Sequence, residues 1–534
     1  MSEYTRLRTP FVNFSFTPDV PSNALGINEY NNGSNVECDV RGIKKISGEQ
    51  EILSTIPGNV VFIDGGFRSE SVWVYIAATR EGKWYLINTS GITNITPGVG
   101  ANPSVSLSGY SDDVNITTSW VGNVFFINDG LRNPMYFLPT NTEMTITSDT
   151  QWNYTPGVSA TRAGFVRNFC SPNVGNILIA GNITQDLSSG TTVNYPTTVR
   201  WSQAFANTGI PGTWMPTLSN VANEQEIPVR GPIVDGFFLG SNFYICSYWD
   251  TVVFSPIAYQ NSTTPVFGVR LLNQGRGLIN NNCWANTDIN VYGVDSRDVW
   301  VFDGSNFSPL GNQKVRDYLF TNLSTTYSSR MFMINNSQKN QIEIYYPDLT
   351  STGWCNKMLS WRYDLNLWNA PKDIANAANA CEGPKLVGSV FKLASRTVTY
   401  GRGSVSSSKL VQTGIGNSFI NAQPIPALFE RNNVVLQTDK GPVPYSSKVY
   451  IHRLLAEVAG TGTIDITVGG SNSTAQAATY GQTGTVSIVT DNPWVTTQQN
   501  TFRTTSIKVY SNDATDTWNL TALNWQASIT EDAF

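Results

Sequence analysis

Paired acidic side chains are the residues of this sequence with the clearest potential for chemistry. Two carboxylates about 5 to 10 Å apart can cleave a glycosidic bond, one as acid and the other as base or nucleophile. The nearest pairs along the chain are Asp112 with Asp113, Asp295 with Asp298, and Glu49 with Glu51. All three stand in polar or turn-like segments, where a solvated acid is more common than a carboxyl with a shifted pKa. We therefore expect no catalytic residue among them.

Metal and nucleophile chemistry have even less support. His452 is the only histidine, and it lies in an alternating stretch, Lys448 to Leu454, that favours a surface or interface strand. A histidine-rich zinc site is excluded, and Asp295 and Asp348 lack the spacing of a calcium loop. No serine-hydrolase, phosphate-loop or zincin motif occurs. We expect no enzyme activity, no metal and no cofactor.

Cysteines and tryptophans indicate packing more than function. The cysteines are scattered without a CxxC pair, which predicts free and mostly buried thiols in a reducing cytosol: Cys38, Cys170, Cys246, Cys283, Cys355 and Cys381. Several tryptophans could stack on sugars but lie inside strand-like runs, so core packing is the favoured interpretation: Trp73, Trp84, Trp300, Trp361 and Trp368. A carbohydrate-binding receptor module and a glycan-cleaving propeller enzyme both stay open as alternatives.

The elements that must position these residues are strands. From about residue 58 onwards, β-branched and aromatic residues alternate with polar ones between Gly, Asn, Asp and Pro. Several runs end in an aromatic pair followed by a turn sequence, as in Val61 to Gly65, Phe125 to Gly130 and Val299 to Gly304. Residues 313–321 are the best helix candidate, and 375–380 are a weaker one. The irregular repeat predicts divergent propeller blades, although a β-sandwich series could give the same pattern.

Three consecutive regions are expected. Residues 1–55 are rich in Asn and Pro and predict an arm or strand-exchange segment. Residues 56–420 hold most strands and predict the propeller-like core. Residues 421–534 predict a further β-rich platform or sandwich. The fold class is therefore all-β, a β-propeller-like core with an additional β-sandwich or platform domain.

The surface is poor in charge. Charged residues make up 14% of the chain, against roughly 25% in typical soluble domains, and the net charge is −5. Tight nonspecific DNA binding is disfavoured, because it needs clustered Lys and Arg. The N-terminus lacks the apolar stretch of a secretory signal, and the weakly charged segment 231–269 is interrupted by Gly, Ser and Asn throughout. We expect neither export nor stable membrane insertion.

Several segments, in this order, resemble the tail hub or nozzle proteins of short-tailed bacteriophages, also called packaged-DNA stabilisation proteins. They are Val40 to Gly48, Asn123 to Gly130 with Asn133 to Tyr136, Thr198 to Gln203, Gln274 to Ile279, Val291 to Gly304, Val315 to Phe320, and Leu359 to Trp368. The resemblance implies a structural virion protein at the distal part of the DNA channel, which retains the packaged genome and lets it leave.

The same resemblance implies partners and a location. A ring of subunits, expected to be a homohexamer, would contact tail adaptor and fibre proteins, let genomic DNA pass through transiently, and could touch the host envelope. The protein would be assembled in the host cytoplasm and reside in the virion tail.

Overall fold

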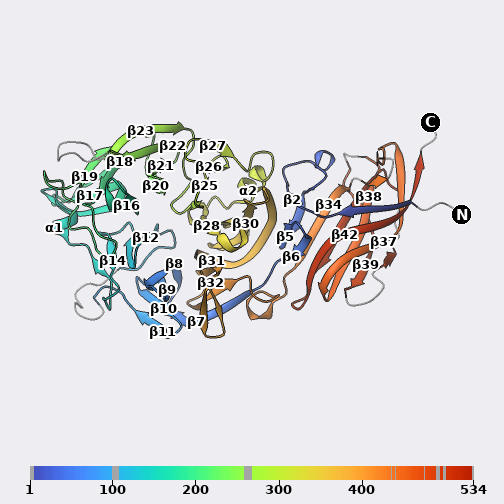
Figure 1. The fold of residues 1–534 in the computed structure, drawn as a ribbon, viewed down its shortest axis with the longest axis horizontal. Coiled ribbons are helices and arrows are strands. Elements are labelled where there is room, and N and C mark those ends of the chain that lie inside the picture. The colour runs from blue at the N-terminus through green and yellow to red at the C-terminus, as the bar shows by residue number, and fades with distance from the viewer. Residues whose placement is uncertain are drawn as a thin grey trace.

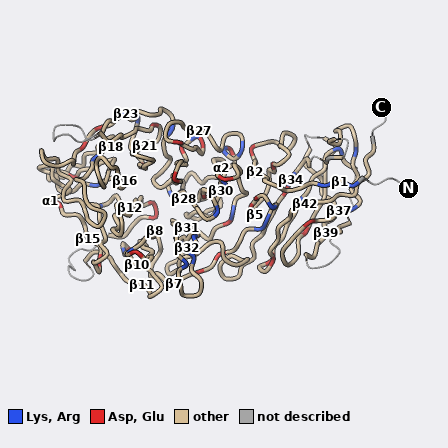
Figure 2. Tube along the Cα trace, in the orientation of Figure 1, with Lys and Arg blue, Asp and Glu red and all other residues tan. Residues whose placement is uncertain are grey.

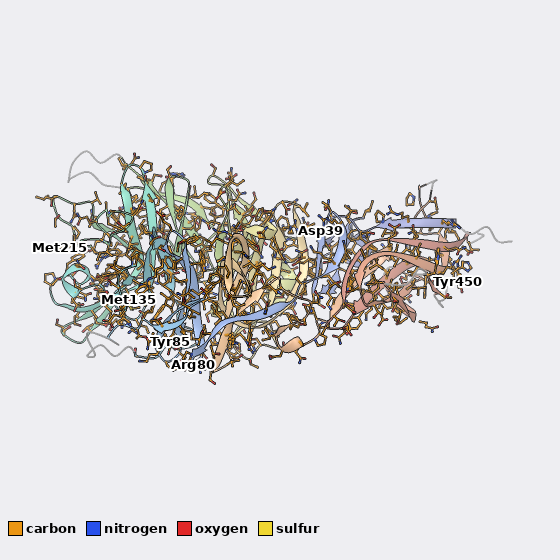
Figure 3. All side chains as sticks on the ribbon, turned by 60° about the horizontal axis from the view of Figure 1, so that its bottom comes forward. Asp39, Arg80, Tyr85, Met135, Met215 and Tyr450 are labelled. Atoms are coloured by element: carbon orange, nitrogen blue, oxygen red, sulfur yellow. The ribbon has the colours of Figure 1, made fainter. Side chains whose placement is uncertain are left out.

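The computed structural model describes residues 5–98, 108–257, 267–434, 436–438, 441–473, 476–488, 494–496 and 501–531. These residues form two bodies side by side, a ring of small sheets and a β-sandwich, and the first and last described strands both lie in the sandwich (Figure 1). A second view shows the same arrangement along the long axis of the molecule, with Met215 at the outer end of the ring and Tyr450 in the sandwich (Figure 3).

Five consecutive four-stranded antiparallel meanders make up most of the ring. The first is β8 to β11 (Val60–Ser69, Val72–Thr79, Trp84–Asn88, Gly91–Asn94), and the second is β12 to β15 (Thr117–Val121, Val124–Asn128, Met135–Phe137, Thr145–Ile146). The third is β16 to β19 (Val158–Ser171, Gly175–Leu187, Thr192–Trp201, Asn223–Glu226). The fourth is β20 to β23 (Ile233–Leu239, Asn242–Ser247, Asp250–Pro256, Phe267–Gln274), and the fifth is β24 to β27 (Trp284–Asn286, Val291–Val294, Val299–Phe302, Phe307–Pro309).

A seven-stranded sheet supplies the last two blades. Its order is β28-β29-β30-β31-β32-β33-β7 (Phe332–Asn336, Gln341–Tyr346, Cys355–Arg362, Leu367–Val387, Val390–Arg402, Ser407–Thr413, Glu49–Pro57). The long strand β31 pairs with β30 through its first half and with β32 through its second half, and its register shifts after Ala377. Asn376, with a φ of 56°, marks the change of direction. The described residues thus form a seven-bladed propeller.

The ring is closed by a strand from the start of the chain. β7 pairs antiparallel with β33, so the outermost strand of the seventh blade precedes the first blade in sequence. On the other side, β31 and β32 pack on β8 of the first blade. This arrangement ties both ends of the propeller into one sheet.

The second body is a sandwich of two sheets built from both chain ends. One sheet has the order β40-β37-β42-β6-β5 with β1 also on β42 (Trp494–Thr496, Ser447–Thr461, Thr517–Glu531, Gly42–Lys45, Val36–Asp39, Thr5–Pro10). The other has the order β39-β38-β41-β34-β4 (Thr479–Ser487, Thr463–Ser471, Thr504–Ser511, Ala427–Val434, Asn32–Ser34). Two small pairs complete the strands: β2 with β3 (Ser15–Phe16, Glu29–Tyr30) and β35 with β36 (Gln437–Thr438, Gly441–Pro442).

Helices are short in the described residues. The two α-helices are α1 (Asp149–Trp152) and α2 (Arg316–Asn322), and the 3-10 turns are η1 (Ser22–Ala24), η2 (Ser328–Arg330), η3 (Ser337–Lys339) and η4 (Ile420–Ala422). α2 buries Leu319, and the carboxylate of Asp19 accepts the backbone N–H groups of Asp317 and Tyr318 at its first turn, both at 2.8 Å. The N-terminal segment therefore caps a helix of the propeller.

One hydrophobic core joins the two bodies. A continuous buried cluster runs from sandwich residues such as Phe429 and Trp525 to propeller residues such as Leu319 and Trp368. Phe16 packs edge-on against Tyr318 with ring centroids 5.5 Å apart. Buried apolar contact of this extent holds the sandwich and the propeller together.

Polar contacts reinforce this junction. The Nδ2 of Asn35 donates to Asp373 at 2.7 Å, and the Asp373 N–H donates back to the side-chain oxygen of Asn35 at 2.8 Å. Glu37 on β5 pairs with Lys339 on η3 at 2.5 Å. Since these partners are more than 300 residues apart in sequence, the junction depends on the complete fold.

The all-β, propeller-like fold class expected from the sequence is confirmed. The expected helix at 313–321 overlaps α2, whereas the weaker candidate at 375–380 was wrong, because those residues lie inside β31. Asp303 and Gly304 form a turn, as their sequence predicts, but Asp64 and Gly65 lie inside β8.

The expected division of the chain differs from these bodies at its start. Residues 5–45 supply strands to the sandwich, and β7 belongs to the propeller, so the described part of 1–55 is not a separate arm; residues 1–4 lie outside the described residues. Near the second boundary, β33 ends at Thr413 and β34 begins at Ala427.

Candidate functional site: the axial cavity

The first strand of every blade faces a cavity on the propeller axis. Its volume is about 410 Å³, within the range of small-ligand pockets, about 300 to 1,000 Å³. Most of its lining comes from seven segments, one per blade: 62–64, 118–120, 167–168, 236–238, 284–286, 332–335 and 379–382; Phe243 and Asn282 complete it. Ring closure therefore places residues more than 300 positions apart around one space.

A buried ion pair forms one wall of the cavity. Arg167 on β16 donates through Nε and Nη2 to the two carboxylate oxygens of Asp235 on β20, at 2.9 and 2.6 Å. The remaining guanidinium nitrogen donates to the backbone oxygen of Thr118 at 3.0 Å, and the indole of Trp284 lies 5.3 Å from the guanidinium carbon. A bidentate pair of this kind joins neighbouring blades and leaves the arginine fully engaged.

Asp64 lines another wall without a cationic partner. The Thr118 hydroxyl donates to Oδ2 at 2.6 Å and the Gly65 N–H donates to Oδ1 at 2.7 Å. No Lys or Arg nitrogen within the described ranges lies within 4 Å of this carboxyl. Burial raises the pKa of Asp64, and the hydrogen bonds from Thr118 and Gly65 only partly oppose that effect.

Two glycines position the aromatic side chains next to Asp64. A Cβ on Gly66 would lie 2.4 Å from the indole of Trp120, and one on Gly65 would lie 2.8 Å from Trp73. The glycines therefore let two indoles pack against the backbone of β8. Sequence reasoning treated Asp64-Gly65 as turn chemistry and did not identify Asp64, Trp120 or Trp284 as cavity residues. The lining segments begin 47 to 69 residues apart, and this recurrence is the signal that could have grouped them.

The first pair of acids proposed from sequence is held by arginines. Asp112 pairs with Arg80, and Asp113 accepts a hydrogen bond from Arg330 at 2.9 Å. Burial raises the pKa of the Asp113 carboxyl, but the hydrogen bond and charge of Arg330 outweigh it and leave the pKa lowered. An acid in this state has little capacity to donate a proton near neutral pH.

In the second pair, Asp295 contacts an arginine, whereas Asp298 accepts a backbone N–H group. Asp295 accepts a hydrogen bond from Arg276 at 2.9 Å and from the backbone N–H groups of Arg297 and Asp298. Burial raises the pKa of Asp298, whose Oδ1 accepts the N–H of Val299. Both acids thus stabilise a turn of the fifth blade.

The third pair lies in the sheet that closes the ring. Glu49 is buried, pairs with Lys372 at 3.0 Å and accepts the hydroxyl of Tyr400 at 2.6 Å. Glu51 pairs with Arg402 at 3.3 Å. These acids connect β7 to β31 and β32, which is a structural role.

Asp348 and His452 also have local partners. Asp348 accepts hydrogen bonds from Thr350 and Asn356 within its own turn. His452 lies 2.7 Å from the Ser528 hydroxyl and packs edge-on against Tyr450. Within the residues that the structure describes, no group of three or more His, Cys, Asp or Glu side chains is placed to hold a metal ion.

The tryptophans and cysteines singled out in the sequence lie mainly in the core. All five of those tryptophans are buried: Trp73, Trp84, Trp300, Trp361 and Trp368. All six cysteines are free, and Cys170 is the exposed one. None of the helices in the described ranges has the length and apolar character needed to cross a membrane.

No family model and no curated protein matches the chain. Among solved structures, the chain is similar to the WD40 repeats of RRP9, with 7% identity, 70% of this chain and 99% of that chain covered, and a TM-score of 0.40. It is also similar to the extracellular domain of the putative hybrid two component system BT3049 from B. thetaiotaomicron, with 10% identity, 74% of this chain and 49% of that chain covered, and a TM-score of 0.38.

Proposed function

We propose that the chain is a structural subunit of a bacteriophage tail, a hub or nozzle protein that forms the distal part of the DNA channel. The ordered sequence segments that resemble such proteins support this assignment, and one structural feature carries it. That feature is a projecting apolar hairpin on the propeller, which has the properties of a subunit contact.

The projecting hairpin comprises residues 383–397 of β31 and β32. β33 pairs with Thr399 and Tyr400 of β32, so the hairpin extends beyond the four-stranded part of the blade. At its tip Val387 and Val390 face each other across the turn and are 51% and 55% exposed. Exposed apolar side chains clustered at a projection mark an interaction site more often than a solvated surface.

The charges of the hairpin indicate the kind of partner. Lys385 and Lys392 are directly opposite each other, an arrangement that destabilises an isolated pair of strands. An acidic partner surface would remove this repulsion while it covers the valines. In this proposal the partner is a neighbouring copy of the chain, whose net charge is −5.

A ring held by such head-to-tail contacts would act sterically and electrostatically. The subunits, six in our proposal, set the bore, and loops at a constriction retain the packaged DNA until ejection. Across the described part of the chain, acidic and basic residues are scattered along the trace without a continuous basic tract (Figure 2). A weakly charged wall of this kind would let DNA slide instead of gripping it. Tail adaptor and fibre proteins would bind the outer surfaces.

The test combines particle microscopy with hairpin variants. In virions that contain this chain, we expect electron cryo-microscopy to place a ring of six copies on the tail axis. The double substitution Val387→Ser and Val390→Ser should prevent ring formation by the purified protein, measured by mass photometry. Ile289→Ser, which removes a 72%-exposed apolar side chain elsewhere on the propeller, is the matched control. A trimeric spike, a monomer in virions, or rings that survive the double substitution would contradict the proposal.

A further inference from the structure

We propose that the axial cavity binds a small organic cation of the alkylammonium class, with its charged head beside Asp64 and its alkyl part against the aromatic lining. This site is separate from the projecting hairpin and from the channel function. It follows from the balance of hydrogen-bond donors, acceptors and charges around the cavity.

Arg167 and the indole of Trp284 in the cavity wall already have acceptors, whereas the indole N–H of Trp120 has no hydrogen-bond partner. The guanidinium of Arg167 donates hydrogen bonds to Asp235, to the Thr118 backbone oxygen and to the side-chain oxygen of Asn282. The Trp284 N–H donates to Asp235 at 2.9 Å. An anion entering the cavity would find no free arginine, which disfavours phosphate and nucleic acid as ligands.

Acceptors, in contrast, remain available. The side-chain oxygen of Asn335 is buried without a hydrogen-bond partner, while its amide nitrogen is fixed by the backbone oxygen of Asn286 at 2.9 Å. Asp64 accepts one hydrogen bond on each oxygen, and a carboxylate has room for about four in all. Leaving such acceptors unmatched costs free energy, so a ligand rich in donors is favoured.

The charge of the lining has the sign that a cation requires. Asp64, Arg167 and Glu382 are the charged side chains that line the cavity, and Arg167 is neutralised by Asp235. The Oε1 of Glu382 accepts the hydroxyl and the N–H of Ser337, and its Oε2 lies 3.8 Å from a guanidinium nitrogen of Arg396. The carboxyl of Asp64 is therefore the group left for a ligand to neutralise.

Aromatic side chains complete the site. Trp120, Trp284 and Phe238 line the cavity, and Phe238 is 40% exposed at its mouth. Aromatic faces attract organic cations through their quadrupole, and the attraction grows where water is excluded. Together with one unneutralised carboxyl, they form the combination that binds alkylammonium groups.

The experiment is a titration of the full-length protein with putrescine, spermidine and tetramethylammonium chloride. Ligand-detected NMR and calorimetry are run at constant ionic strength, with glucose and inorganic phosphate as the neutral and anionic probes. We expect at least one cation to bind with a Kd of about 1 mM or tighter, and neither glucose nor phosphate to bind. Asp64→Asn keeps the shape of the side chain and should weaken cation binding at least tenfold.

Two further variants keep the test decisive. Asp288→Asn removes the same charge from an exposed turn on the same blade as Trp284 and should leave the affinity within twofold. Phe238→Ser changes an exposed side chain, so it should fold even if Asp64→Asn does not, and it should weaken binding severalfold. The proposal is overturned if no cation binds the native protein at 10-fold the expected Kd. It is overturned equally if Asp64→Asn and Phe238→Ser bind as the native protein does, or if glucose or phosphate binds in place of the cations.

Discussion

Glu37 offers a quantitative test of the junction between the sandwich and the propeller. Its carboxylate is buried on β5, 2.5 Å from the Lys339 Nζ and 3.8 Å from the Lys44 Nζ. Burial by itself would raise the pKa of Glu37, but the charges of Lys339 and Lys44 outweigh it and lower the pKa from 4.5 to about 2. Folding therefore stabilises the ionised form of Glu37 relative to its protonated form.

The magnitude follows from this difference. At about 1.36 kcal/mol per pKa unit, a pKa of about 2 in place of 4.5 corresponds to about 3 kcal/mol of stability. Because the folded pKa lies below the unfolded one, this contribution is complete above about pH 5 and is lost as the pH falls towards 2. Glu37→Gln should therefore lower the free energy of unfolding by about 2 to 3 kcal/mol at pH 7, and by much less near pH 3.

Urea denaturation followed by circular dichroism, at pH 7 and pH 3, measures this difference. Glu457→Gln is the matched control, since contact with Arg8 lowers the pKa of Glu457 to about 2 as well, yet both side chains are more than one third exposed. Solvent screening should limit the cost of that control to below about 1 kcal/mol. Equal costs for the two variants, or a cost of Glu37→Gln that does not change with pH, would refute the reasoning.

Three further outcomes are expected. Gly66→Ala should destabilise the protein by about 1 to 3 kcal/mol, because the new Cβ would lie 2.4 Å from the Trp120 indole. Gly268→Ala, whose new Cβ would meet nothing nearer than 3.6 Å, is the comparison in thermal unfolding. Truncation at about residue 420 should yield no assembly-competent chain, because β1 and β6 would lose β42 and β4 would lose β34; normal particles from a truncated gene would disprove this. Incubation with envelope glycans, peptidoglycan or DNA should release no product. A product that is lost when Asp112, Asp113, Asp295 or Asp298 is changed to Asn would instead support a glycosidase.

The blades were predictable because their signals are local. Apolar residues in segments such as Val72 to Thr79 and Val299 to Phe302 predict strands. Strands that are neighbours in sequence then pair as meanders. Asn340 is likewise a local signal, because Asn tolerates the positive φ, here 53°, of a turn between consecutive strands. The number of blades was not predictable, because two of them share β31 and no turn sequence separates them.

The sandwich could not be predicted as it stands. Its strand β1 pairs with β42, with Arg8 opposite Asn524, and no local pattern encodes a partner more than 500 residues away. The polar composition of residues 1–55 indicated an arm, since short strands such as β4 and β5 contain Gly, Asn and Asp. Burial of Phe11, Phe14 and Tyr30 against Phe429 is what holds this segment in the fold.

The candidate site was missed for a related reason. Asp64 has an ordinary sequence context, and its unusual surroundings arise from Thr118, Trp120 and Arg167 on the next two blades. Conversely, Asp112 and Asp295 attracted attention by their spacing, although arginines from other loops neutralise them. The charged partners of an acidic residue in a propeller can come from other blades or loops. Sequence spacing alone therefore cannot tell which acids lack a positively charged partner.

The path of the chain couples the two bodies mechanically. The chain starts in the sandwich, contributes β7 to the last blade, runs through the ring and returns to the sandwich, while one hydrophobic core spans the junction. Opening the seventh blade would separate β7 from β33, and the strain would pass directly to β5 and β6 through the three residues that precede β7. Unfolding of the propeller and of the sandwich should therefore be one cooperative transition, in contrast to domains linked by a flexible segment. In the proposed DNA-channel function, the channel wall would gain from that coupling, because neither body can yield without the other.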